Sequence, residues 1–173
     1  MKLLILIILQ MLFTQCCSFL CDDDELSLPL IPYTGNELRI DGYYYQIGDD
    51  GKGFYDVYFF YKNGIILNLG GGQNSLYELD EYVERCKQNK YVYSSKIGWG
   101  IFVIEGNNIK FERWYPKEKP YYAYVREGII LNDTTFHITK SYRSNGTNYS
   151  PEDEIYYFRK FSPKPDSTNN FIK

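Results

Sequence analysis

The chain is poor in the residues that most often carry chemistry. It has one histidine, His137, and beyond residue 21 it has one cysteine, Cys86. A zinc site draws on several His or Cys ligands at short spacing, and His137 has neither a second histidine nor a cysteine at such a spacing. A disulfide framework would need cysteines scattered through the fold. We therefore expect no metal, no cofactor and no disulfide scaffold.

A surplus of charge of one sign is also lacking. The 19 Lys and Arg residues are interspersed with 22 Asp and Glu residues, which gives a net charge of −3. A nucleic-acid-binding protein presents a basic face to the phosphate backbone. The charge pattern therefore excludes nucleic acid as the expected partner.

The sequence contains no recognisable catalytic constellation. The glycine run at 70–72 is followed by Gln73, not by the Gly-Lys-Ser/Thr of a phosphate-binding loop. Cys86 and His137 could act as a nucleophile pair only if the fold joined them. Glu105 and Glu112 are expected to flank a turn as solvated residues. We predict that the protein is not an enzyme.

Aromatic residues, by contrast, are abundant. They make up 18% of the 173 residues, with 19 Tyr and 11 Phe. Tyrosine favours pleated, half-buried surfaces, so this bias predicts an all-β domain. Asn63-Gly64 and Gly106-Asn107-Asn108 each stand between apolar runs, as hairpin turns do. The alternating pattern predicts eight strands, at 38–47, 54–61, 65–69, 101–105, 109–115, 121–131, 135–143 and 154–161.

One helix is predicted between the third and fourth strands. Ser75 and Glu78 have the spacing of a capping box, and an apolar stripe follows at helical spacing. Eight antiparallel strands can close into a barrel, which removes exposed edges. We predict an eight-stranded antiparallel up-and-down barrel, with a two-sheet β-sandwich as the alternative. The apolar stripe of the predicted helix consists of Leu76, Leu79, Tyr82, Val83 and Cys86.

The first residues are typical of an export signal. Lys2 precedes an apolar run of about a dozen residues, which is too short to span a bilayer that takes about 20. The cysteines that close this run resemble those of a bacterial lipoprotein signal, in which the thiol is acylated. We predict lipidation at Cys16, with Cys17 or Cys21 as alternatives, and a secreted or periplasmic protein as the other localisation.

This interpretation divides the chain into four parts. Residues 1–15 are the signal peptide, and residues 16–36 form an acidic, proline-containing tether that includes Asp22-Asp23-Asp24-Glu25. Residues 37–163 form the barrel, and residues 164–173 form a polar tail that covers an edge or hangs loose.

Over residues 38–163 the order of strands resembles that of the lipocalin-like (calycin) lipoproteins of the Bacteroidetes cell envelope. Gly42-Tyr43-Tyr44 stands where lipocalins carry Gly-x-Trp, and Arg159 stands where the arginine that packs against this tryptophan is found. The resemblance implies a pocket for a small apolar or amphipathic ligand. It also implies a monomer anchored by its lipid in the outer membrane and exposed at the cell surface.

Two sets of aromatic residues are candidate binding surfaces. For a ligand pocket, the sequence points to Tyr58, Phe60, Trp99 and Trp114. The alternative function is a surface interaction or glycan-contacting scaffold with a solid core, since exposed aromatic faces with polar edges suit sugars and protein partners. Its candidate platform consists of Trp114, Tyr115, Tyr121, Tyr122 and Tyr124.

Overall fold

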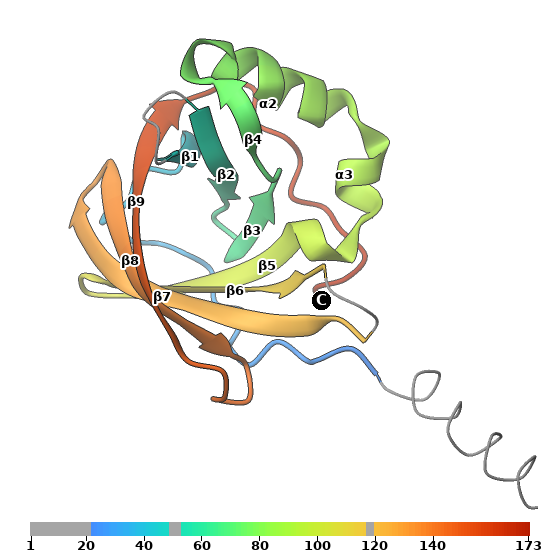
Figure 1. Cartoon of the computed structure of the whole chain (residues 1–173), viewed down its shortest axis with the longest axis vertical. Coiled ribbons are helices and arrows are strands. Elements are labelled where there is room, and N and C mark those ends of the chain that lie inside the picture. Colours follow the sequence, from blue (N-terminus) through green and yellow to red (C-terminus); the bar gives the residue numbers. More distant parts are fainter. Residues whose placement is uncertain (1–21, 49–52, 117–119) are drawn as a thin grey trace, which may run out of the picture.

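A computed structural model describes residues 22–48, 53–116 and 120–173 (Figure 1). Eight strands form a closed antiparallel barrel, because β1 pairs with both β2 and β9 and so joins the two ends of the sheet. The barrel prediction is confirmed, and the sandwich is excluded. In ring order the strands are β1 (Gly42–Ile47), β2 (Gly53–Phe60), β3 (Ile65–Asn68), β5 (Trp99–Glu105), β6 (Asn108–Tyr115), β7 (Tyr122–Asn132), β8 (Thr135–Arg143) and β9 (Ser150–Lys160).

The predicted hairpin turns are present. Gly64, between β2 and β3, has φ of 82°, and Gly106, between β5 and β6, has φ of 59°. A side chain strongly disfavours this left-handed region, so glycine fixes both turns. A ninth strand, β4 (Gly72–Ser75), was not predicted and pairs with the start of β2 outside the ring.

The predicted helix lies between the third and fourth barrel strands. After a 3₁₀ turn, η1 (Leu76–Glu78), the chain forms α2 (Leu79–Gln88), then α3 (Lys90–Ser94) and a second 3₁₀ turn, η2 (Lys96–Gly98). The Ser75 hydroxyl accepts a hydrogen bond from the Tyr77 N–H, as an N-cap does. The apolar stripe of α2 packs on the barrel wall, with Leu79 and Val83 fully buried.

The structure has two hydrophobic cores that share one wall. The inner core fills much of the barrel, and the outer core lies between β1, β2, β3 and β5 and the covering layer of α2, α3 and the C-terminal tail (Figure 1). Along β2, Tyr58 and Phe60 face the inner core, whereas Val57 and Phe59 face the outer one. This explains why the strand is aromatic on both sides, since neither of its faces meets water.

Both ends of the described chain pack against the barrel. The Tyr33 N–H donates to the Lys62 carbonyl, and the Lys164 ammonium donates to the Ile40 and Phe60 carbonyls. Residues 22–36, the described part of the predicted tether, therefore follow the barrel wall. The tail covers the outer core through Phe171 and Ile172.

The predicted signal peptide and the lipidation site Cys16 lie outside the described residues. Within the described ranges, no helix has both the length and the apolar character that crossing a membrane requires.

The inner core predicts a large stability loss on truncation of Phe60. Its ring lies 5.0 Å from that of Phe102 and 5.5 Å from that of Tyr44, centre to centre, and is fully enclosed. Phe60→Ala should lower the free energy of unfolding by about 3–5 kcal/mol, measured by urea denaturation. The control Tyr77→Ala removes a ring that is 98% exposed and should change it by less than about 0.5 kcal/mol. Equal effects of the two changes would contradict the core assignment.

Candidate functional site: the tyrosine-lined mouth of the barrel

Neighbouring strands place aromatic and cationic side chains side by side on the inner face of the barrel. Alternate residues of a strand share a face, and cross-strand partners lie on the same face. Tyr115 of β6 is paired with Tyr122 of β7, and Arg113 of β6 with Tyr124 of β7. Arg126 of β7 is paired with Phe111, a residue of the inner core. The polar residues thus begin where the aromatic core ends.

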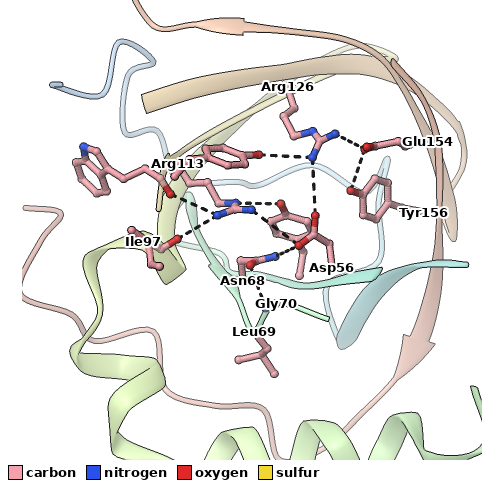
Figure 2. A network of polar contacts seen from close by, with 12 residues as sticks. Asp56, Asn68, Leu69, Gly70, Ile97, Arg113, Arg126, Glu154 and Tyr156 are labelled. Carbon is pink, nitrogen blue, oxygen red and sulfur yellow. Dashed lines mark hydrogen bonds and ion pairs between the residues drawn. The ribbon is translucent and has the colours of Figure 1, made fainter. Parts of the chain in front are cut away.

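Arg113 is held inside the barrel by several acceptors (Figure 2). Its Nε donates to the Tyr58 hydroxyl at 3.0 Å, and its Nη1 donates to the Ile97 and Trp114 carbonyls, both at 3.3 Å. The residue is 7% exposed. A buried cation needs such partners because leaving water is costly for it.

The strand opposite Arg113, β5, carries a glycine that lets it lie close to β6. Gly100 is the partner of Arg113 on β5, and a Cβ atom at Gly100 would lie 2.1 Å from the Glu112 carbonyl oxygen. Only glycine therefore allows β5 and β6 to approach as closely as they do here.

Arg126 forms the second buried cation, and it is 8% exposed. Its Nη2 forms an ion pair with Glu154 and lies 3.9 Å from Glu152 Oε2. Its Nη1 lies 3.5 Å from the Tyr115 hydroxyl and 3.8 Å from Asp56 Oδ2 (Figure 2). Its Nε has no hydrogen-bond partner within the part of the chain that the structure describes.

Asp56 reaches both guanidinium groups because β2 bulges at this point. The pairing of β1 with β2 shifts register between Tyr45 and Gln46, and Asp56 adopts φ of 32°. Its carboxylate lies 3.8 Å from Arg113 Nη2 and accepts a hydrogen bond from Asn68 Nδ2 at 3.1 Å. Aspartate tolerates positive φ better than most residues, and the two ion pairs favour this conformation.

The surroundings keep the two arginines charged and the tyrosines neutral. Burial by itself would lower the pKa of Arg126, but the neighbouring Tyr115, Tyr156 and Glu154 raise it above its usual value. Burial raises the pKa of Tyr58 and of Tyr156 well above that of an exposed phenol. The phenols therefore act as hydrogen-bonding hydroxyls at neutral pH.

A cavity of about 320 Å³ opens at this mouth. Tyrosine rings form its walls, and Arg126 and Glu152 form a polar floor beneath them. Ser141 donates its hydroxyl proton to Glu152 Oε1 at 2.6 Å and so orients that carboxylate. Such a volume lies at the small end of ligand sites. The residues that line the cavity are Tyr115, Pro116, Tyr122, Tyr124, Arg126, Ser141 and Glu152.

The four residues predicted for a ligand pocket are not brought together. Tyr58 and Phe60 belong to the inner core, and Trp99 belongs to the outer core, where its Nε1 donates to the Tyr93 carbonyl at 3.0 Å. Trp114 is buried on the outer face beneath the N-terminal segment, and its Nε1 donates to the Asp24 carbonyl at 2.6 Å. None of the four lines the mouth cavity.

The predicted aromatic platform is divided by the alternation of the strands. Tyr115, Tyr122 and Tyr124 line the cavity, whereas Trp114 faces outward and the Tyr121 backbone pairs with Asp24. The charged groups at the mouth, which come from β2, β6, β7 and β9, were not predicted from the sequence. Their one local sign is that Arg113 and Arg126 occupy inward positions of strands whose other inward residues include aromatic ones.

Two further expectations are corrected. Glu112 was expected to be solvated, but it is fully buried and accepts hydrogen bonds from the Ser27 and Leu28 N–H groups at 2.7 and 2.8 Å. Arg159 was expected against Tyr44. Tyr44 points inward and donates to the Asp133 carbonyl, whereas Arg159 is paired with Tyr43 on the outer face. A strand's alternation separates the two faces, so residue 159 cannot pack beneath Tyr44.

The only histidine also lies away from the mouth. His137 Nε2 lies 2.7 Å from an Asp153 carboxylate oxygen. Among the described residues, no three His, Cys, Asp or Glu side chains are grouped as a metal site would need. Cys86 packs against the outer core on α2.

Comparison with known protein families, curated proteins and solved structures finds no match to the chain.

The N-terminal segment fixes one wall of the mouth. Asp24 accepts hydrogen bonds from Arg143 Nε and Nη2 at 2.8 and 2.7 Å, and from the Ala123 N–H at 3.1 Å. The guanidinium carbon of Arg143 lies 3.7 Å from the centre of the Tyr122 ring. The hydrogen bonds from Arg143 lower the pKa of Asp24, and burial opposes them less strongly.

The lowered pKa of Asp24 predicts a pH-dependent contribution to stability. Because the folded protein holds this carboxylate more acidic than the unfolded chain does, its contribution is full above the unfolded pKa of about 3.9 and is lost as pH falls below it. Asp24→Asn should lower the free energy of unfolding by about 1–2 kcal/mol at pH 6. Urea denaturation of both proteins from pH 6 to pH 3 should show that difference shrinking. A difference that stays constant over this range would contradict the ion pair.

Proposed function

We propose that the protein is a non-enzymatic binding module of the cell envelope, whose barrel mouth holds a small amphipathic ligand. The observation that carries the proposal is the cavity that joins tyrosine walls to the polar floor of Arg126 and Glu152. Ligand sites commonly combine an apolar lining with a few placed polar groups. The rings would contact the apolar body of the ligand, and the floor would hold its polar end.

The polar groups of the floor support this assignment. Arg126 and Glu152 both line the cavity, and Ser141 donates a hydrogen bond to Glu152 Oε1. The polar end of a ligand would therefore meet a cationic side chain beside an oriented carboxylate.

The remaining groups favour binding over catalysis. Asp56 and Glu154 are already paired with the two guanidinium groups, so they are not free to exchange protons with a substrate. Burial raises the pKa of Tyr58 and Tyr156, which makes these phenols poor bases. General acid–base catalysis instead uses a group whose pKa lies near the working pH.

The proposed location in the cell envelope rests on the sequence. Lipidation at Cys16, as in the Bacteroidetes lipoproteins that the chain resembles, would place an anchor eight residues before Asp24 at the rim of the mouth. Eight extended residues span at most about 29 Å. The mouth would then lie close to the membrane surface, where amphipathic molecules concentrate.

The binding proposal predicts that Tyr124 is needed and Tyr77 is not. Octyl β-D-glucopyranoside, below its micelle concentration, should shift the nuclear magnetic resonance signals of the mouth, including the Arg126 Nε–H. Tyr124→Ala removes one wall of the cavity and should raise the dissociation constant about fivefold. Tyr77→Ala, on the exposed side of η1, should leave it unchanged. The proposal fails if the wild-type signals do not move, or if both variants bind equally.

The anchor is tested separately on the protein made in a Bacteroidetes host. Mass spectrometry of the mature chain should show an acylated N-terminal Cys16, and Cys16→Ser should release the protein from the membrane fraction. A mature chain that starts near residue 21 without a lipid would contradict the anchor and support the secreted alternative.

A further inference from the structure

The charged group most accessible from the cavity is a carboxylate. Among the described residues, the charged side chains that line the cavity are those of Arg126 and Glu152. Arg126 is almost fully buried and forms an ion pair with Glu154, whereas the Glu152 side chain is 24% exposed. Glu152 Oε1 accepts the hydrogen bond from Ser141, and Oε2 lies 3.9 Å from Arg126 Nη2, beyond hydrogen-bond distance. Oε2 is not fully enclosed, and it can accept a hydrogen bond from a ligand.

The charges around the cavity leave this carboxylate in excess. Each of the three arginines at the mouth has a carboxylate of its own close by, among the described residues. These pairs are Arg113 with Asp56, Arg126 with Glu154 and Arg143 with Asp24. Glu152 is the fourth carboxylate, so the described groups of the mouth carry one formal negative charge in excess. The cavity therefore attracts a cation and repels an anion.

The tyrosine rings favour a ligand of the same charge, because the face of an aromatic ring attracts cations. The guanidinium carbon of Arg113 lies 3.9 Å from the centre of the Tyr115 ring. That of Arg143 lies 3.7 Å from the centre of the Tyr122 ring. No lysine or arginine of the described ranges lies over the third ring, that of Tyr124. Tyr124 thus offers a ligand a ring that the protein's own cations leave unused.

We infer that the ligand of this mouth is an amphipathic amine, whose ammonium group donates a hydrogen bond to Glu152 Oε2. An ammonium group has three donors and no acceptor, and its hydrogen bonds to a carboxylate are charge-assisted. The apolar chain of the amine extends outward along the tyrosine walls. This inference rests on the proposed binding function and names the charge and chemistry of the polar end of the ligand.

The test compares probes that share an apolar tail and differ in the charge of the head. The full chain is titrated at pH 7 with octylammonium chloride, 1-octanol and sodium octanoate, and the backbone amide signals of Tyr124, Ser141 and Glu152 are the site-specific readout. Octylammonium should bind about tenfold more tightly than 1-octanol, and octanoate should bind more weakly than either. If octyl glucoside shifts these signals but 1-octanol or octanoate binds as tightly as octylammonium, the inference is overturned while the binding function stands. If octyl glucoside and all three of these probes fail, both are overturned.

A second comparison distinguishes two sources of such an amine. Dihexanoyl phosphatidylethanolamine carries its ammonium group on a lipid headgroup, next to a phosphate. Because the mouth repels anions, this lipid should bind more weakly than octylammonium, which assigns the site to free alkylamines. Tighter binding of the phospholipid would overturn that assignment and place a lipid headgroup on Glu152.

Glu152→Gln provides the matched variant, because it keeps the shape of the side chain and removes its charge. It should weaken octylammonium binding about tenfold, as loss of a charge-assisted hydrogen bond does, and change 1-octanol binding by less than about twofold. Glu127→Gln is the control, since it removes the same charge from the outer face of β7, where Glu127 pairs with Lys110 and Lys140. It should leave octylammonium binding within about twofold of the wild type. Equal weakening by the two variants would attribute the preference to overall charge and overturn the assigned role of Glu152.

Discussion

Two guanidinium groups lie inside the barrel. The carboxylates that neutralise them must lie nearby, and this requirement constrains where the other residues of the mouth can be placed. Moving an ion out of water costs several kcal/mol even after relaxation, so Arg113 and Arg126 need carboxylates close by. Asp56 comes from β2 and Glu154 from β9, whereas the arginines come from β6 and β7 on another part of the ring. The ion pairs of Asp56 therefore cross the barrel, whereas Glu154 reaches Arg126 past the single intervening strand β8. Asp56 lies opposite the arginines because β1 pairs with both β2 and β9 and so closes the ring.

This polar layer also explains why the cavity lies where it does. Deeper in the barrel the rings of the inner core occupy the space, with Phe111 and Phe136 among them. At the mouth, by contrast, charged groups must be hydrogen-bonded and cannot be packed as freely as rings. The interior is accordingly packed with rings below the mouth and hollow at the mouth itself.

Features fixed by neighbouring residues were predictable from the sequence. Gly64 and Gly106 define their turns locally, and Ser75 caps the 3₁₀ turn η1 that leads into α2. Alternation also showed which residues share a face. It could not tell which face is inside when both faces are covered. Trp99 and Trp114 were therefore predicted in the pocket, although both lie on the outer side of the barrel. Asp56 depends on a bulge, and Glu112 depends on a segment 84 residues away. Such long-range contacts leave no local pattern.

The wall shared by the two cores has a consequence for how the molecule opens. Since β2 and β3 carry side chains of both cores, the helical layer cannot detach without exposing apolar surface that also supports the barrel. That side should behave as one cooperative unit, with the slowest amide hydrogen exchange. The hairpin end of β7 and β8 contributes no residue to the outer core among the described residues. Its amides should therefore exchange through smaller local openings that leave the closed ring intact.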